Sequence, residues 1–312
     1  MTNVEPLHFA LCADRYVLPG LHVTLYTALL HLPRNTHAEI SVFTDSLTDS
    51  DIKLLNGTLQ RTRRSFSLMR RTINLSAFHQ LPWQGGWMTY ARLVIPSFLQ
   101  TRRVIYLDAD LIVHADLSEI WTADMAGAAL GAASWGTIAQ SNDRAFFTDL
   151  GIDTSAPYFN GGVLLIDCDV WRTTNVTQRC LDFALQHASR LPSMDQTVLN
   201  YVFCKSFAKL PRRFNTPVTA SRRPLKFADV ENRIIHLVAY PKPWDALGIL
   251  NGQYYLFQAW LPKTEWRSRP TNILQWRTLR KARAILKCFP NLFRNIRRHS
   301  RDIMRQIENY AV

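Results

Sequence analysis

The chain has 312 residues, of which 47% are hydrophobic and 11% aromatic, a composition typical of a packed globular protein and not of a disordered one. No apolar run approaches the roughly 20 residues that a bilayer-spanning helix needs, so the sequence predicts no such helix. The five cysteines are scattered and odd in number, without metal-binding or redox spacing, and we therefore expect a reduced, cytoplasmic protein.

The net charge of +13 is concentrated at the C-terminal end of the chain. From Arg267 onward, twelve Lys or Arg stand against only Asp302 and Glu308, which leaves a charge of +3 for the preceding 266 residues. This asymmetry predicts two parts, a globular domain over residues 1–262 and a basic segment over residues 263–312.

Strands and helices alternate along the first half of the chain. In chain order, apolar and β-branched runs predict strands at 8–13, 40–44, 104–107, 128–133 and 162–166, with helices at 19–32 and 48–59 between the first of them. Ser46 or Thr48 is available to cap the second helix. The alternation predicts an α/β domain with a largely parallel sheet. Ligands bind at the carboxyl ends of such strands, where Asp14 and Asp108 lie.

Two carboxylates, Asp108 and Asp110, follow the apolar run at 104–107. Alternate residues of a strand point to opposite faces, so this pair converges only if the strand ends there and the chain turns. Ala109 between them is small and permits a ligand to approach closely. Carboxylate oxygens suit Mg²⁺ or Mn²⁺. A solvated turn is the alternative, but the position after an apolar strand favours a metal site.

Four further motif blocks accompany this pair. In chain order they are Met88-Thr89-Tyr90-Ala91-Arg92-Leu93, Tyr158-Phe159-Asn160-Gly161-Gly162 with the apolar run after it, Met194-Asp195-Gln196-Thr197-Val198-Leu199-Asn200, and His236 followed by Pro241-Lys242-Pro243-Trp244. Over residues 7 to 250 this set resembles the family 8 glycosyltransferases, especially bacterial lipooligosaccharide galactosyltransferases and lipopolysaccharide glucosyltransferases. The resemblance implies a GT-A fold, a nucleotide-binding Rossmann-like mixed sheet flanked by helices, with a UDP-hexose donor, Mn²⁺ (or Mg²⁺) and retention of anomeric configuration.

The resemblance also implies roles for individual residues. Asp108, Asp110 and His236 match the metal ligands, and Asp195 and Gln196 match the catalytic positions beside the transferred hexose. The expected donor-binding residues are Ala13, Asp14, Tyr16, Arg92, Asp108, Ala109, Asn160, Asp195, Gln196 and Lys242. Taken alone, His236 in its apolar run is as compatible with a hydrogen-bonded core histidine, and Lys242 with an exposed loop lysine. The co-occurrence of the blocks in family order favours the site.

Trp135 departs from the family pattern. The galactosyltransferases in this comparison carry an aspartate at the corresponding position, where it helps to bind the transferred sugar. We therefore expect Trp135 to line the donor pocket and to alter the choice between hexoses.

The C-terminal segment combines cations with apolar residues at helical spacing. The apolar positions are Leu292, Phe293, Ile296, Ile303, Ile307 and Tyr310, and the cationic ones Arg294, Arg297, Arg298, Arg301 and Arg305. Such a helix is typical of an interfacial membrane segment, although the same composition can bind nucleic acid or pack on the protein body. We favour an anionic membrane surface, expect no nucleic-acid partner, and expect the protein on the inner face of the cell membrane.

Together these features predict a retaining hexosyltransferase that moves glucose or galactose from a UDP-sugar to a lipopolysaccharide or lipooligosaccharide core acceptor, which is lipid-linked. Two alternatives stay open at this point. One is transfer to a protein or another glycan, and the other is a non-catalytic protein that binds sugar nucleotides or nucleic acid.

Overall fold

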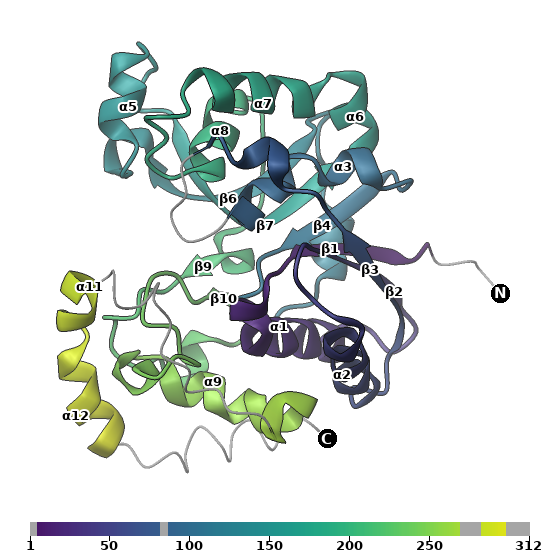
Figure 1. The fold of residues 1–312 in the computed structure, drawn as a ribbon, viewed down its shortest axis with the longest axis vertical. Helices are drawn as coiled ribbons and strands as arrows, with labels where there is room; N and C mark the ends of the chain where they lie inside the picture. Colours follow the sequence, from purple (N-terminus) through teal and green to yellow (C-terminus); the bar gives the residue numbers. More distant parts are fainter. Residues whose placement is uncertain (1–4, 82–86, 269–281, 298–312) are drawn as a thin grey trace.

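The computed structural model describes residues 5–81, 87–268 and 282–297. A seven-stranded mixed sheet runs through the centre in the order β3-β2-β1-β4-β7-β6-β8 (Figure 1). Its strands are β1 (Leu7–Cys12), β2 (His37–Thr44), β3 (Ser65–Thr72), β4 (Arg103–Leu107), β6 (Leu130–Thr137), β7 (Pro157–Asp167) and β8 (Ala208–Lys209). All five predicted strands are present, and the edge strand β3 was not predicted.

Most neighbouring strands of this sheet are parallel. The strands β1 to β4 pair in parallel and so do β6 and β8, whereas β7 runs antiparallel to both β4 and β6. The sheet is therefore mixed but largely parallel, which confirms the prediction. The carboxyl ends of β1 and β4 open at the same edge, which brings Asp14 and Asp108 to one place as expected.

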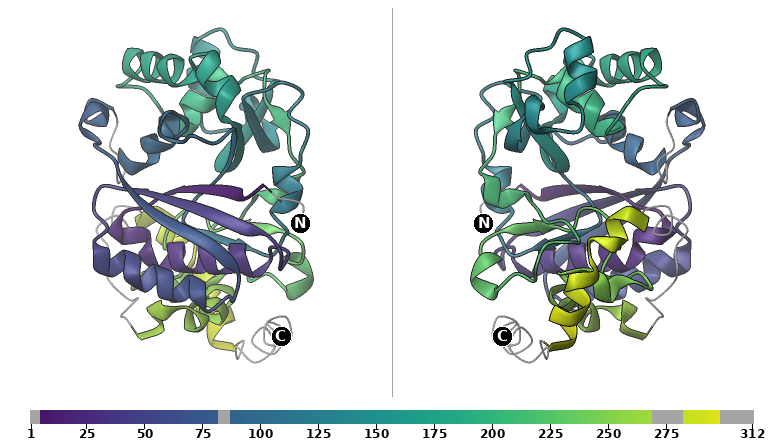
Figure 2. Two further views of the ribbon diagram at one scale, coloured as in Figure 1. Left: turned by 90° about the vertical axis from the view of Figure 1, so that its right-hand side faces the viewer. Right: turned by 90° about the vertical axis from the view of Figure 1, so that its left-hand side faces the viewer.

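Helices cover both faces of the sheet (Figure 2). On one face lie α1 (Leu18–Leu30) and α2 (Asp49–Gln60), with α9 (Tyr254–Trp260) beyond them, and on the other lie α6 (Cys168–Thr173), α7 (Val176–Gln186) and α8 (Asp195–Val202). The shorter helices are α3 (Ile95–Phe98), α4 (Ser118–Trp121) and α5 (Arg144–Asp149). Thr48 caps α2 in a capping box with Asp51, which confirms one of the two predicted caps.

Directly after the two aspartates, the chain enters a second sheet of three strands. It consists of β5 (Leu111–Val113), β10 (Ile234–His236) and β9 (Thr216–Pro217), with β10 in the middle. Its register places His236 opposite Leu111, beside Asp110. The buried helix α1 fixes this sheet, because the Thr24 hydroxyl donates to the Leu111 carbonyl at 3.0 Å. Residues far apart in sequence therefore meet at the carboxyl edge of β4.

The described part of the C-terminal segment lies on the protein body. It forms α11 (Ala282–Leu286) and α12 (Phe289–Arg297), which pack beside the 3₁₀ turn η7 (Gly248–Leu250) (Figures 1 and 2). Ile285 and Cys288 are buried there against Ala220 and Leu250. The predicted positions from Arg298 to Tyr310 lie outside the described residues. Among the residues that the structure describes, no helix has the length and apolar character to cross a bilayer.

Candidate active site

Asp108, Asp110 and His236 come together where β4 ends. The chain turns after Leu107, and this turn is held by the Asp108 amide, which donates to the Gly162 carbonyl at 2.8 Å. One potential ligand atom from each of the three side chains lies within 4.8 Å of the other two. The two carboxylates were expected to converge only if the chain turns after the strand, and this turn is present.

The chemistry of these three groups fits a divalent cation. Oδ1 of Asp110 is buried without a hydrogen-bond partner and lies 3.2 Å from Nε2 of His236. Oδ2 of Asp108 lies 3.6 Å from the same nitrogen. Two carboxylates and an imidazole nitrogen facing one another in this way form the oxygen and nitrogen donor set that Mn²⁺ or Mg²⁺ accepts, with solvent or phosphate oxygens completing the shell.

Asn215 fixes the orientation of the imidazole. Its amide nitrogen donates to both the backbone carbonyl and the side-chain oxygen of Asn160, at 3.1 and 2.9 Å. Its own oxygen must therefore accept, and it lies 3.1 Å from Nδ1 of His236. Nδ1 then carries the proton and Nε2 presents its lone pair to the carboxylates. Asn215 was not predicted, because nothing in its local sequence distinguishes it.

Lys242 completes this side of the site. Its ammonium donates to Oδ2 of Asp110 at 2.6 Å and to the Leu237 carbonyl at 2.5 Å. Burial alone would lower the pKa of Lys242, but the Asp110 carboxylate raises it above its ordinary value. Conversely, burial would raise the pKa of Asp110, but Lys242 holds it well below its usual range. The side chain is therefore a fixed positive charge and not an exposed loop lysine.

Arg92 anchors the opposite side. It contacts Oδ1 of Asp108 and Oδ2 of Asp195, each at 2.8 Å, and donates to the Gly161 carbonyl at 2.6 Å. Burial disfavours the charged guanidinium, but the two carboxylates raise the pKa of Arg92 well above its ordinary value. The Tyr106 hydroxyl also donates to Asp108, at 2.8 Å. One carboxylate of the candidate metal site is thus held in place by an arginine and a tyrosine.

The two glycines after Asn160 make room for these side chains. A Cβ atom on Gly161 would lie 2.9 Å from Nη1 of Arg92, and one on Gly162 would lie 2.3 Å from Cε1 of His236. Neither contact is compatible with a larger residue unless the site rearranges. The glycines therefore serve the close packing of Arg92 and His236 against β7, a requirement that the sequence alone did not reveal.

Asp195 and Gln196 stand at the start of α8, after a strained residue. Met194 has φ 55° and ψ −127°, a conformation that side chains rarely adopt and that is concentrated at functional sites. Asp195 is buried and accepts from the Thr89 hydroxyl as well as pairing with Arg92. Burial raises the pKa of Asp195, and Arg92 opposes that rise.

The Gln196 side chain lies against β7. Its oxygen accepts from the Asn160 amide at 3.0 Å and from the Gly161 backbone at 3.2 Å. Its amide nitrogen donates to the Tyr158 hydroxyl at 3.1 Å. Gln196 and Asn160 are therefore held as a pair.

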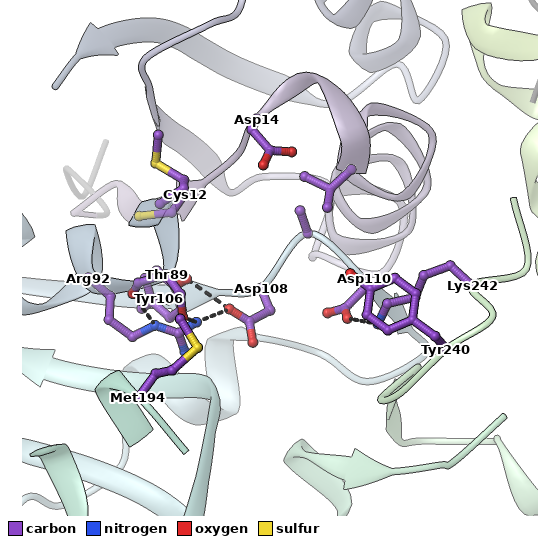
Figure 3. A pocket seen from close by; sticks show the side chains of 13 residues that line it. Cys12, Asp14, Thr89, Arg92, Tyr106, Asp108, Asp110, Met194, Tyr240 and Lys242 are labelled. Atoms are coloured by element: carbon purple, nitrogen blue, oxygen red, sulfur yellow. Dashed lines mark hydrogen bonds and ion pairs between the residues drawn. The ribbon is translucent and has the colours of Figure 1, made fainter. Parts of the chain in front are cut away.

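A cavity of about 250 Å³ opens between these groups. Figure 3 shows Arg92, Thr89, Tyr106 and Met194 on one side of Asp108, and Asp110 with Lys242 and Tyr240 on the other. The complete lining is Cys12, Asp14, Val17, Met88, Thr89, Arg92, Tyr106, Asp108, Ala109, Asp110, Met194, Tyr240 and Lys242. Six predicted site residues are in this set, namely Asp14, Arg92, Asp108, Ala109, Asp110 and Lys242.

The remaining predicted residues, which include His236, do not line this cavity. Ala13 is fully buried behind it, Tyr16 is 52% exposed, and Asp195 is buried against Arg92. Asn160 and Gln196 line a second cavity of about 270 Å³ instead. The second cavity is also lined by Trp135, Gly136, Thr137, Gln140, Ser141, Asn142, Tyr158 and Ser193.

Trp135 therefore lines the second cavity and is absent from the lining of the one beside the two aspartates. It is 40% exposed, its indole nitrogen donates to the Asn215 carbonyl, and the Arg212 guanidinium lies 5.4 Å from the centre of its ring. The hydrogen bond and the stacked cation hold the ring in place while part of it faces solvent.

Known proteins share this sequence pattern and fold. The chain is 24% identical over 268 residues to general stress protein A of Bacillus subtilis, covering 79% of this chain and 90% of that protein. It is 23% identical over 273 residues to lipopolysaccharide 1,3-galactosyltransferase of Salmonella typhimurium, covering 83% and 79%. The crystal structure of the galactosyltransferase LgtC with donor and acceptor sugar analogs superimposes with a TM-score of 0.69 at 20% identity, covering 84% of this chain and 99% of that one.

The last of these likenesses shows the GT-A fold. The family model of glycosyl transferase family 8 matches residues 8–248, a range that contains all of β1 but its first residue, both aspartates, the Arg92 block, His236 and Lys242. This match covers more than half of the chain and confirms the resemblance drawn from the motif blocks. The chain belongs to glycosyl transferase family 8.

Proposed function

We propose that this glycosyltransferase is a retaining enzyme that moves glucose or galactose from a UDP-sugar to a lipopolysaccharide or lipooligosaccharide core acceptor. The observation that carries the proposal is the convergence of Asp108, Asp110 and His236 beside the ammonium of Lys242, with both aspartates and the lysine lining one cavity. Such a group of ligands and a cation matches a diphosphate bound through a divalent metal.

The donor's diphosphate would be bound on the Lys242 side of the cavity. Mn²⁺ (or Mg²⁺), held by the two aspartates and Nε2 of His236, would supply a Lewis acid beside the diphosphate. Lys242 adds a fixed positive charge 2.6 Å from Asp110. These charges would stabilise the negative charge that develops on the departing UDP. The uridine would extend along the cavity wall past Asp14 toward the exposed ring of Tyr16.

The transferred hexose would lie toward Arg92, Asn160 and the start of α8. Both oxygens of Asp195 are engaged, one by Thr89 and the other by Arg92. This geometry supports a role for Asp195 in holding Arg92 beside the sugar, while Gln196 presents an amide to the second cavity. A covalent intermediate on Asp195 would require this carboxylate to leave Arg92, whereas a front-face reaction beside Gln196 leaves the ion pair intact.

The saccharide acceptor would occupy the second cavity. Asn160 and Gln196 line that cavity and lie next to the Gly161 carbonyl that Arg92 contacts in the first. The exposed part of the Trp135 ring offers a flat apolar surface, on which the C–H face of a sugar can stack. We therefore assign Trp135 to the acceptor instead of the donor.

The outer face of α11–α12 supports contact with an anionic membrane surface. Leu286, Phe289 and Phe293 are 65%, 46% and 64% exposed. Arg283, Lys287 and Arg294 are exposed around them. Apolar side chains surrounded by cations are typical of interfacial helices, and a lipid-linked acceptor would be presented at the cytoplasmic leaflet of the cell membrane.

A panel of UDP-sugars with Mn²⁺ tests the proposed reaction. We expect slow hydrolysis of UDP-glucose or UDP-galactose without acceptor, and none when a chelator replaces the metal. With an acceptor, NMR of the product should show an α-anomeric proton. A β-anomer would contradict retention, and donor binding without hydrolysis or transfer would favour a non-catalytic protein. Equal transfer to a protein acceptor would contradict the core saccharide.

A further inference from the structure

The helix α12 buries polar side chains and exposes apolar ones. Asn291 and Asn295, one turn apart, have no exposed surface, whereas Phe289 and Phe293 are 46% and 64% exposed. An ordinary surface helix does the opposite. A buried asparagine needs hydrogen-bond partners, because an unpaired amide in the interior loses the hydrogen bonds that it makes with water in the unfolded chain. The inner face of α12 is therefore built to bind particular polar groups.

Those groups are backbone carbonyls of two loops. The Asn291 amide donates to the carbonyls of Ala220 and Arg222, at 3.0 and 3.2 Å. The Asn295 amide donates to the carbonyls of Ile249 and Asn251, at 2.7 and 3.0 Å. Each asparagine thus bridges two carbonyls of one loop, and α12 joins the loops.

The two loops also pack directly on each other at Gly252. Its amide donates to the Ala220 carbonyl at 2.9 Å. A Cβ atom on Gly252 would lie 1.8 Å from the Arg222 carbonyl oxygen and 3.0 Å from the Asn291 amide nitrogen. The contact between the loops is therefore backbone against backbone, and α12 closes it from outside.

The loop that Asn295 contacts leads back to Lys242. Asn251 is buried, and its amide donates to the carbonyl of Pro241, the residue before Lys242, at 2.8 Å. The Lys242 backbone amide donates in turn to Asp245 at 2.8 Å. A continuous series of contacts therefore connects Asn295 through Asn251 and Pro241 to the lysine beside Asp110.

The loop that Asn291 contacts leads to the metal-binding histidine. It follows β9, in which Pro217 pairs with His236 of β10. The next residue, Val218, donates its amide to the His236 carbonyl at 2.8 Å. The two asparagines of α12 therefore hold loops that connect to different residues of the same site.

We propose that Asn291 and Asn295 are positioning residues for the donor site, with Asn295 acting on Lys242 and Asn291 on His236. The flexible stem of a lysine brings its ammonium to a fixed point only when the backbone that carries it is itself held in place. Asn295 supplies that restraint through Asn251. The proposal rests on the proposed role of Lys242 at the diphosphate. It gives the C-terminal segment a part in catalysis, whereas none of the site residues expected from the sequence lies in that segment.

A double-mutant cycle on the full-length protein tests Asn295. We expect Asn295→Ala to weaken binding of UDP with Mn²⁺ about tenfold in calorimetry. The reason is that the carbonyls of Ile249 and Asn251 lose the amide that donates to them, and the loop next to Lys242 is then less firmly held. Lys242→Met should weaken binding as well. In the Lys242→Met protein, Asn295→Ala should not weaken UDP binding further, because there is no longer an ammonium at residue 242 to be positioned.

Control variants must distinguish a general loss of stability from a displacement of Lys242 or His236. Asn175 is exposed at the start of α7, in the layer on the far side of the sheet, with φ 52°. Alanine is strained in that conformation, so Asn175→Ala should lower the melting temperature without changing UDP affinity. Asn291→Ala provides a second variant, which should weaken Mn²⁺ binding in the presence of UDP even when Lys242 is methionine.

Each outcome has a definite meaning. If Asn295→Ala lowers UDP affinity equally in the wild type and in the Lys242→Met protein, the positioning role is wrong. The role is also wrong if Asn295→Ala leaves UDP affinity unchanged, or if Asn291→Ala leaves Mn²⁺ affinity unchanged. If Asn295→Ala does not fold, an Asn291→Ala protein with wild-type Mn²⁺ affinity would overturn the proposal. If the wild type fails to bind UDP with any metal, the proposed function itself fails, and the positioning role fails with it.

Discussion

Nδ1 of His236 lies 3.1 Å from Oδ1 of Asn215, and this contact determines which nitrogen faces the two aspartates. The Asn215 amide nitrogen is already committed to Asn160, so the histidine must donate to the asparagine oxygen. The lone pair that Nε2 presents to the two carboxylates is therefore a consequence of a residue outside the candidate ligand set. Such outer contacts orient metal ligands throughout metalloproteins.

Replacement of Asn215 should weaken metal binding. We expect Asn215→Ala to reduce Mn²⁺ affinity, measured by calorimetry in the presence of UDP, by about 10- to 100-fold, because the imidazole loses its fixed orientation. The melting temperature in chelator serves as the control for stability. Wild-type Mn²⁺ affinity in a folded Asn215→Ala protein would show that the contact does not orient His236.

Trp135 should affect the acceptor and leave the donor alone. Loss of a stacked indole face costs about 2 kcal/mol, roughly 30-fold in binding. Trp135→Ala should therefore raise the acceptor KM by about that factor while the KM for the UDP-sugar stays unchanged. A shift in relative kcat/KM among donor hexoses would instead support the expectation from the sequence that Trp135 acts on the donor.

The outer face of α11–α12 should bind anionic vesicles in two separable ways. Arg283→Gln with Lys287→Gln removes two cations, each contributing about 1 kcal/mol near an anionic leaflet. This pair should reduce cosedimentation at low salt and matter little at high salt. Phe289→Ser with Phe293→Ser should reduce the binding that persists at high salt. If the full-length protein does not bind anionic vesicles at low salt, the proposed contact with an anionic membrane surface is wrong.

A buried histidine predicts loss of stability in mild acid. Burial, with the neighbouring His31, lowers the pKa of His114 from 6.5 to about 3. Its neutral form is favoured in the fold, so the stability it contributes is complete above pH 6.5. That contribution decreases toward pH 3, because the unfolded chain takes up a proton first. The slope for this group is about 1.4 kcal/mol per pH unit.

The free energy of unfolding should therefore depend less steeply on pH once His114 is removed. Denaturant titrations of wild type and His114→Phe between pH 7 and pH 5 provide the comparison, since the phenylalanine keeps the packing against Trp260, 5.3 Å from His114 between ring centres. Parallel curves for the two proteins would show that His114 is not the group responsible.

Local patterns in the sequence predicted the strands and the carboxyl edge at which Asp14 and Asp108 lie. They missed β3, whose side chains are exposed or half-buried along an edge and lack an apolar run. They also missed that β7 runs antiparallel to β4, because strand direction depends on the connection between strands and not on the residues within them.

The candidate site could be predicted only in part. His236 and Lys242 lie more than 120 residues beyond Asp110, and the family resemblance, not spacing, joined them to it. Asn215, Asn291 and Asn295 act through backbone carbonyls or another side chain, and an asparagine carries no local signal of such a role. The sequence also could not show that Trp135 lines a cavity other than the one beside the two aspartates, because only the fold separates the two cavities.

The central claim is that a divalent metal held by Asp108, Asp110 and His236 binds the donor diphosphate. Calorimetric titration of UDP-glucose and UDP-galactose into wild type, with Mn²⁺ and with chelator, tests it most directly, with Asp110→Ala and Asp108→Ala alongside. The account predicts binding of at least one donor in Mn²⁺, and none in chelator or in either variant. Undiminished binding in chelator, or in the variants with Mn²⁺ present, would contradict it.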